Sequence, residues 1–402
     1  MLRLSRSTVM SVESTRLTAA RRAAEVPPFH AMAMSARATE HERAGHRVLY
    51  LQVGQPSTGA PNGARRAVIT ALERGDSLGY TNAPGLPALA DRIERHYLET
   101  HGARVAAERV MIVGGASAGF TLAFLACFDP GDRVAVLEPG YPCYRNTLIA
   151  LGVTPVPIPV GPTTGWVPTR ESLEAAGDLD GIVIASPSNP TGTSLDTNAL
   201  SSLVDFCRER RIQLVADEIY HGITYDAPAD SVTRHSDEAV VVNSFSKYFS
   251  MTGWRLGWMV VPDRLHDAVE RMQQNLYICA PHISQIAGLA AFDCRAELDA
   301  HVDRYRENRA VLVEGLAAAG ISRIAPADGA FYVYADVSHL TDDSMLLCDR
   351  WLSELGVATT PGLDFDLARG RRFVRFSYAG RREHLEEACR LLAGWQIGRA
   401  HV

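Results

Sequence analysis

The sequence predicts an α/β fold, built on a mostly parallel, seven-stranded-type sheet with helices on both faces and joined to a smaller α+β domain. Six short apolar runs lie between residues 109 and 262 without polar alternation, which is typical of strands buried on both faces. Helix-like segments and turns rich in Gly, Pro, Ser and Asn separate these runs, as in β-α-β units. The 402 residues, 47% of them apolar, are enough for two or three compact units.

The predicted elements of the large domain follow one another along the chain. Its strands are Arg109–Val113, Arg133–Leu137, Gly181–Ala185, Ile212–Ala216, Ala239–Asn243 and Gly257–Val261. Between and after them, Asn198–Arg211 and Pro262–Leu276 show the spacing of apolar residues that is typical of helices. Helices between consecutive strands predict parallel pairing.

After residue 290 the pattern changes to one that is typical of a small α+β domain. A long amphipathic helix is predicted over Ala296–Ala319. It is followed by strands Ala330–Val337 and Phe373–Ser377 and by helices Ser344–Leu355 and Arg382–Trp395. Residues before about 57 lie outside the α/β pattern, so we expect a large domain of residues 58–290 and a small domain formed by residues 1–57 and 291–402.

Composition excludes several classes of protein. A net charge of -6 without a dense basic run argues against nucleic-acid binding, and no apolar stretch approaches the roughly 20 residues of a membrane span. Seven scattered cysteines without C-x-x-C pairs predict reduced thiols in a cytoplasmic enzyme, and no histidine spacing predicts a metal site. The first twenty residues carry one acid, Glu13, and are expected to form a disordered or loosely docked extension rather than a presequence.

Lysine is nearly absent from the chain. Of the 40 Lys and Arg residues, 39 are Arg and one is Lys247. Arginine replaces lysine wherever only positive charge is needed, but a guanidinium stays protonated and is a poor nucleophile towards an aldehyde. Chance survival is the alternative. We therefore expect Lys247 to act through its primary amine.

Polar motifs follow four of the predicted strands. They are Gly114-Gly115-Ala116-Ser117-Ala118-Gly119, Ser186-Pro187-Ser188-Asn189-Pro190-Thr191-Gly192, Asp217-Glu218-Ile219-Tyr220 and Ser244-Phe245-Ser246-Lys247. In open α/β sheets ligands bind beyond the carboxyl ends of the strands. The four motifs are therefore expected to line one pocket.

The order and spacing of these motifs resemble the class I/II aminotransferases, which are fold-type I pyridoxal-phosphate enzymes related to aspartate aminotransferase. The resemblance runs from Leu51–Pro56 to Arg375, and its most specific part is Ser244-x-Ser246-Lys247 with Arg255 eight residues later. It implies the large domain of that fold, the cofactor pyridoxal 5'-phosphate, and a homodimer with shared active sites. The implied reaction moves an amino group between an L-amino acid and a 2-oxo acid by a ping-pong mechanism.

The resemblance also implies roles around the cofactor ring. Lys247 would hold the cofactor as a Schiff base and move a proton at the substrate α carbon as general base and acid. Asp217 would pair with the pyridine nitrogen, while Tyr220 and Asn189 would hydrogen-bond the ring 3-oxygen. Taken alone, Asp217 would suit a helix N-cap and Asn189 a turn.

Further cofactor contacts are implied at the phosphate and over the ring. Phosphate donors would be Arg255, Ser244, Ser246, the backbone N–H groups of Ala116 and Ser117 at a helix start, and Tyr80 of the neighbouring subunit. Tyr141 matches the aromatic residue that stacks on the ring, although an ordinary loop tyrosine is an alternative.

The substrate site is implied mainly by one arginine. Arg375, in an apolar strand, matches the residue that binds the substrate α-carboxylate, with Gly54 adding a backbone contact and Asn189 a side chain. The segment Asn275–Pro281, where aspartate-specific members carry an extra arginine, has none. We therefore expect a neutral or apolar amino acid rather than aspartate.

Other functions remain open from the sequence. Gly115-Ala116-Ser117-Ala118-Gly119 also fits the G-x-S-x-G motif of serine hydrolases, with Ser117 as nucleophile, but fails the dinucleotide motif G-x-G-x-x-G. A pyridoxal-phosphate lyase, such as a C–S lyase or an aminocyclopropane-carboxylate synthase, would share the same residues. A regulator with an aminotransferase-like domain would need an added DNA-binding domain.

Overall fold

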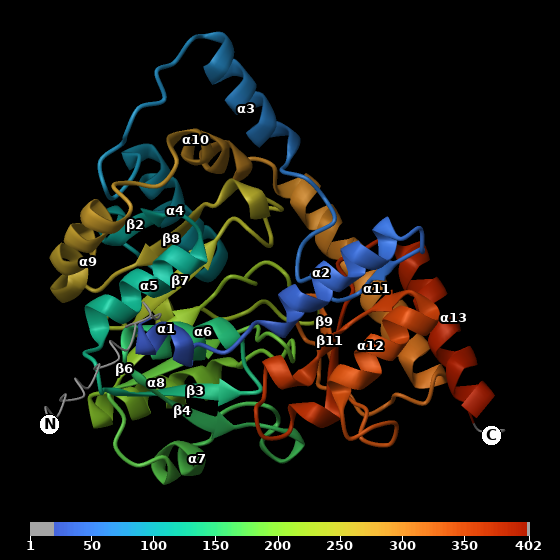
Figure 1. Ribbon diagram of the computed structural model, residues 1–402. Coiled ribbons are helices and arrows are strands. Elements are labelled where there is room, and N and C mark those ends of the chain that lie inside the picture. The colour runs from blue at the N-terminus through green and yellow to red at the C-terminus, as the bar shows by residue number, and fades with distance from the viewer. Residues whose placement is uncertain (1–19, 400–402) are drawn as a thin grey trace, which may run out of the picture.

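A seven-stranded sheet forms the centre of the computed structural model, which describes residues 20–399 (Figure 1). Its strands are β2 (Val110–Val113), β3 (Arg133–Glu138), β4 (Thr154–Pro159), β5 (Gly181–Ala185), β6 (Gln213–Asp217), β7 (Val240–Ser244) and β8 (Gly257–Val260), in the order β2-β8-β7-β6-β5-β3-β4. Among these strands, β8 pairs antiparallel with β2 and β7, and every other pair is parallel. The predicted fold class is confirmed, whereas the prediction for the first twenty residues falls almost wholly outside the described chain.

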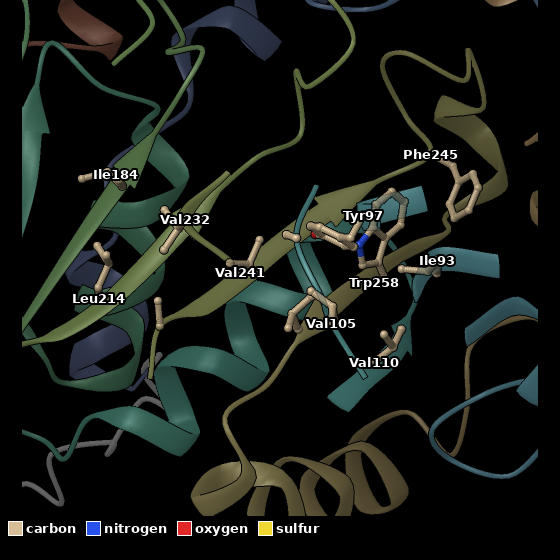
Figure 2. Packing of buried hydrophobic residues seen from close by; sticks show 14 of the residues in the cluster. Ile93, Tyr97, Val105, Val110, Ile184, Leu214, Val232, Val241, Phe245 and Trp258 are labelled. Atoms are coloured by element: carbon tan, nitrogen blue, oxygen red, sulfur yellow. The ribbon is translucent and has the colours of Figure 1, made fainter. Parts of the chain in front are cut away.

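Helices cover both faces of this sheet. Helices α5 (Ala116–Cys127), α6 (Pro142–Leu151) and α9 (Asp263–Leu276) pack on one face, and α4 (Pro87–His101), α7 (Arg170–Ala175), α8 (Thr197–Arg210) and α10 (His282–Ala291) pack on the other. In β7, Val240 and Val242 join the first core and Val241 joins the second, because side chains alternate along a strand. Figure 2 shows Val241 in the second core with Tyr97 and Trp258, whose indole N–H donates to the Tyr97 hydroxyl at 3.2 Å.

The edge strand β4 was not predicted, because its sequence Thr-Pro-Val-Pro-Ile-Pro contains three prolines. Prolines at every second position remove N–H groups from the same side of the strand, and β4 pairs only with β3 at the margin of the sheet. Prolines are tolerated on such an edge, where one row of backbone groups faces away from the sheet.

A smaller sheet lies in the C-terminal part. Strands β9 (Tyr332–Asp336), β11 (Thr360–Pro361) and β12 (Phe373–Ser377) pair antiparallel, and β1 (Leu49–Tyr50) pairs with β10 (Val357–Ala358). Around them lie α2 (His30–Arg43), α11 (Arg295–Ala318), α12 (Ser344–Leu355) and α13 (Arg382–Arg399), while α1 (Arg21–Glu25) and α3 (Asn62–Glu73) complete the set of α-helices in residues 20–399. The early part of the chain therefore packs against the late part, as α2 does beside β11 in Figure 1.

The long helix predicted after residue 290 is present as α11. It buries Leu298, Val302, Leu312 and Leu316 on one side, in agreement with the predicted apolar spacing. Across residues 20–399, none of the helices is both long enough and apolar enough to span a bilayer.

Candidate active site

The carboxyl ends of the parallel strands open into a cavity of about 420 Å³. Its lining includes the predicted site residues Gly54, Ala116, Ser117, Tyr141, Asn189, Asp217, Tyr220, Ser246, Lys247, Arg255 and Arg375. Arg255 reaches this edge because β8 is antiparallel and therefore begins where β7 ends. The predicted convergence of the four strand-end motifs on one pocket is confirmed.

The Lys247 side chain lies at the centre of this set. Its Nζ donates a hydrogen bond to the carbonyl of Gly54 at 2.6 Å. Burial, and then the positive charge of Arg375, lower the pKa of Lys247 to about 8. A substantial fraction of this amine is therefore neutral near physiological pH, as a nucleophile or a general base requires.

Gly54 is confined by its neighbours. A Cβ added at this position would come within 2.1 Å of the Tyr332 hydroxyl oxygen. Glycine is therefore needed for the backbone carbonyl to approach Lys247 closely while Tyr332 occupies the other side.

Asp217 is a buried carboxylate held by two donors. It is the last residue of β6, and its Oδ1 accepts from the backbone N–H of Ile219 at 3.0 Å while its Oδ2 accepts from the Tyr144 hydroxyl. Burial raises the pKa of Asp217 to about 6, although both hydrogen bonds and Lys247 oppose that rise. Within residues 20–399 no cationic side chain forms a salt bridge with it, so it is available to a cationic ligand.

Tyr144 was missed from the sequence. It lies in the first turn of α6 with its ring in the apolar core, so its sequence context is that of an ordinary core aromatic. Only the tertiary structure brings its hydroxyl to a strand end 73 residues away.

Arg375 is buried on β12, where the residue is 3% exposed. One nitrogen, Nη1, donates to the Asn189 side-chain oxygen at 2.9 Å, and Nη2 donates to the carbonyl of Gln52 at 2.7 Å. The guanidinium also lies over the Tyr332 ring at 4.3 Å. Since its partners are neutral, Arg375 keeps an uncompensated positive charge that suits an incoming carboxylate.

Tyr332 is a second residue that the sequence did not indicate, and it connects Arg375 with Tyr220. Its hydroxyl is hydrogen-bonded to the Tyr220 hydroxyl at 2.9 Å. The predicted strand that contains Tyr332 gave no sign of which of its aromatic side chains would face a cavity.

The other end of the cavity is suited to an anion. Arg255 Nη1 donates to the carbonyl of Thr252 at 2.9 Å, and a Cβ added at Gly115 would come within 2.6 Å of Arg255 Nη2. The guanidinium therefore lies against the first turn of α5, where the N–H groups of Ala116 and Ser117 have no partner in the helix itself. A helix start beside an arginine favours phosphate binding.

Two predicted cofactor contacts do not line the cavity. Ser244 is 1% exposed, and its hydroxyl is bonded to the carbonyl of Leu256 at 3.0 Å and to the Ser246 hydroxyl at 2.9 Å, so that it reaches the cavity only through Ser246. Tyr80 is 82% exposed and lies outside the cavity lining.

The serine hydrolase alternative predicts a histidine near Ser117. Ser117 is exposed on the second residue of α5, and none of the described residues that line the cavity is a histidine. The histidine that would take the serine proton in this alternative is therefore missing from the lining. The G-x-S-x-G match covers the N-cap and the first turn of α5.

Comparison with known proteins agrees with this geometry. Residues 46–392 match the family of class I and II aminotransferases. The chain is 49% identical over 377 residues to a valine–pyruvate aminotransferase of Mycobacterium tuberculosis, covering 92% of this chain and 97% of that protein. It is 34% identical to an aspartate/prephenate aminotransferase of Thermus thermophilus, covering 94% of this chain and 99% of that protein.

Solved structures show the same relationship. An aminotransferase from Mycobacterium tuberculosis superposes with a TM-score of 0.92 at 47% identity, covering 95% of this chain and 99% of that chain. Aspartate aminotransferase from Thermus thermophilus with maleate gives a TM-score of 0.89 at 31% identity, covering 94% of this chain and 99% of that chain. With its fold, its strand-end motifs and its relatives in agreement, the chain is an aminotransferase of the class I and II family.

Proposed function

We propose that the protein is a pyridoxal-phosphate-dependent aminotransferase that moves an amino group between a neutral or apolar L-amino acid and a 2-oxo acid by a ping-pong mechanism. The observation that carries this proposal is the meeting of Lys247, Asp217 and Arg375 in one cavity. The name of the relative from Mycobacterium tuberculosis supports valine and pyruvate as the pair to test first.

The residues present fit this cofactor. Lys247 offers the primary amine for its aldehyde, and Asp217 offers a buried carboxylate for its ring nitrogen. Arg255, Ser246 and the start of α5 would hold the phosphate, and Tyr141 and Asn189 border the space for the ring. When bound, the cofactor supplies an electron sink for negative charge that develops at the substrate α carbon.

The chain's own residues perform the remaining work. Arg375 binds the α-carboxylate and so orients the bond between the α carbon and its hydrogen. Lys247, with a pKa near 8, accepts that proton as a neutral amine and returns it as an ammonium. The Asn189 side-chain oxygen accepts from Arg375, which leaves its amide nitrogen to donate to the ring 3-oxygen together with Tyr220. Because one cavity serves both substrates, amino acid and oxo acid bind in turn.

Charge in the cavity supports a neutral amino donor. Its cationic side chains among the described residues are Lys247, Arg255 and Arg375, and each has a role in the proposal. No further arginine or lysine of residues 20–399 lines it, so a side-chain carboxylate of aspartate would lack a partner from this chain. Phe29 and Met32, at the start of α2, add apolar surface.

Single-turnover mixing with a panel of amino acids tests the proposal. The reaction is followed through the absorbance of the bound cofactor. Valine and similar neutral donors are expected to react faster than aspartate. Pyruvate is then expected to restore the starting spectrum. Fastest reaction with aspartate would refute the substrate preference. Release of ammonia and a keto acid without any oxo-acid acceptor would favour the lyase alternative.

Tyr144→Phe is expected to weaken cofactor binding about tenfold at pH 7, because a hydrogen bond to an ionised group contributes about 1.5–3 kcal/mol. Loss of this donor also raises the pKa of Asp217 further, so the pH below which cofactor affinity falls should move upward. Equilibrium dialysis of the cofactor across pH measures both effects.

Tyr225→Phe is the matched control, since the Tyr225 hydroxyl donates to the neutral carbonyl of Ala330. It should lower stability without moving the pH dependence of cofactor binding. An equal shift in the two variants would contradict the role of Tyr144.

We infer a homodimer with shared active sites. Exposed apolar side chains gather on α3, on the loop that carries Tyr80, and at and just after the end of α9: Ile69 at 52%, Leu72 at 55%, Tyr80 at 82%, Leu276 at 53% and Ile278 at 48%. These segments are neighbours, because α3 packs on α10 and the His282 ring is hydrogen-bonded to the carbonyl of Gly79 at 2.8 Å. Helix α3 lies at the outer edge of the molecule (Figure 1), where a second copy could cover it.

Sedimentation is expected to give twice the chain mass of 43.7 kDa. Tyr80→Phe should weaken retention of the cofactor phosphate without changing that mass, because only a hydroxyl is lost. A monomer with full activity would refute the shared site.

We also infer the division into a large domain of residues 58–290 and a small domain of residues 1–57 and 291–402, supported by the pairing of β1 with β10. A cytoplasmic location is supported by the seven cysteines, which are all free.

A further inference from the structure

Gln52 is a buried amide without partners at the edge of the cavity. It is 1% exposed and borders the cavity, yet neither its amide nitrogen nor its amide oxygen has a hydrogen-bond partner in the described chain. Buried polar groups are nearly always bonded, and an unbonded amide is costly. An unpartnered amide on a residue that lines the cavity points to a partner that arrives with the ligand. Neither amide atom is exposed in this structure, so the Gln52 side chain must rotate toward the cavity to meet that partner.

The backbone places Gln52 between two groups of the proposed mechanism. Its carbonyl accepts from Arg375 Nη2 at 2.7 Å and from the Thr360 hydroxyl at 3.0 Å. Two residues later, the carbonyl of Gly54 accepts from Lys247 Nζ at 2.6 Å. Gln52 thus lies next to the arginine that would bind the α-carboxylate and close to the amine that would act at the α carbon.

Arg375 donates several of its hydrogen bonds to other residues of the protein. Nη1 is bonded to Asn189 and Nη2 to Gln52, while Nε is buried and has no hydrogen-bond partner within residues 20–399. A carboxylate has two oxygens and about four acceptor sites, more than the remaining donors of this guanidinium fill. The amide nitrogen of Gln52 offers two further N–H donors.

We propose that Gln52 is a second recognition group for the substrate, donating from its amide nitrogen to the α-carboxylate beside Arg375. The proposal rests on the proposed function, because it takes a 2-amino acid or 2-oxo acid as the ligand. An amide adds a donor without adding charge, whereas a second cation here would further disfavour protonation of Lys247. The amide oxygen remains as an acceptor for the ammonium group of an amino acid, so the amide complements both ends of a zwitterion.

Gln52→Leu tests this assignment in the cofactor-loaded enzyme. The probe is 3-methylbutanoate, which has the carbon skeleton and carboxylate of valine but no amine to react. Its dissociation constant, measured by calorimetry or by titration of the cofactor absorbance, is expected to rise about tenfold, as for loss of a hydrogen bond to a charged group. KM for valine should rise similarly with a smaller change in kcat, since the contact is present before and during reaction.

A neutral probe separates recognition from general damage. The corresponding amide, 3-methylbutanamide, has the same shape without the charge, so Gln52→Leu should reduce the preference for the carboxylate over the amide. Gln52→Glu should reduce that preference further, because it places a negative charge beside the carboxylate. A purely structural role would weaken both probes equally and would overturn the proposal.

Tyr334→Phe is the matched control, because the Tyr334 hydroxyl is also buried without a hydrogen-bond partner in the described chain but does not border the cavity. It should leave both dissociation constants unchanged. Gln52→Met repeats the test if Gln52→Leu does not fold. Normal transamination with unchanged probe binding in the Gln52 variants would refute this assignment alone, whereas a wild-type enzyme that neither binds 3-methylbutanoate nor transaminates would refute the proposed function.

Discussion

Lys247→Arg is expected to abolish amino-group transfer, lowering kcat by more than about 10⁴-fold, since it removes both the covalent attachment and the general base. The substitution keeps positive charge near Asp217 and a donor for the carbonyl of Gly54, so folding should be preserved. A guanidinium cannot carry out either step because it stays protonated. Retained turnover in this variant would refute the central assignment.

The composition of the chain makes the attachment directly measurable. Borohydride reduction of the cofactor-loaded protein should fix one cofactor per chain, and peptide mapping should find it on Lys247, since the N-terminus is the only other primary amine of the unmodified sequence. The Lys247→Arg chain should retain none at this position.

The pH dependence of attachment gives a second readout. Because the pKa of Lys247 is about 8, the rate of attachment to the cofactor-free chain should rise with pH up to about 8 and then level off. Arg264→Lys provides the control, since Arg264 is 51% exposed and lies at the opposite edge of the sheet. An exposed lysine at that position should react with the cofactor more slowly near neutral pH. Its rate of attachment should continue to rise up to about pH 10.4, the ordinary pKa of a lysine side chain.

Asp217→Asn is expected to lower the rate of the half-reaction with valine by about 10³-fold, comparable to the loss of one preorganised electrostatic contact. Asparagine has nearly the same shape and can still bond to Tyr144 and to the N–H of Ile219. The variant therefore removes the negative charge of Asp217, which is proposed to pair with the cofactor ring, while leaving the packing in place.

The pH dependence of cofactor binding should reveal the same charge. In the wild type the contribution of Asp217 is present above its pKa of about 6 and is lost as pH falls through that value, because the protonated carboxyl is neutral. Asp217→Asn should lack this part of the pH profile in equilibrium dialysis. A cofactor analogue methylated on its ring nitrogen, and so permanently cationic, should recover part of the lost rate. If the two profiles coincide, Asp217 does not pair with the ring.

Much of the large sheet was predictable because its strands are buried on both faces. Gly181–Ala185 was predicted with its observed bounds, and the bounds of the other predicted strands of this sheet differ from the observed ones by one residue. Continuous β-branched runs leave few alternative positions for a strand. The strand β4 was not predictable, because local sequence cannot tell an edge strand that tolerates proline from a loop. The antiparallel direction of β8 was likewise decided by pairing between distant segments.

Some residues of the candidate site were predictable from the sequence and others were not. Asn189, Asp217 and Lys247 stand at strand ends in recognisable motifs, so the sequence indicated them. Tyr144 and Tyr332 act through single hydroxyl groups on otherwise ordinary core aromatics, and nothing in their local sequence marks them.

The sequence alone determined the fold class, the strand-end motifs and the special position of Lys247, because each of these rests on local spacing or on a chemical property of one residue. The tertiary structure decided that Gln52 and Gly54 lie beside Arg375 and Lys247, more than 190 residues away. It also decided the burial that brings the pKa of Lys247 near 8 and that of Asp217 near 6. Burial and long-range proximity arise only when distant segments pack together, which is why these properties could not be predicted from local sequence.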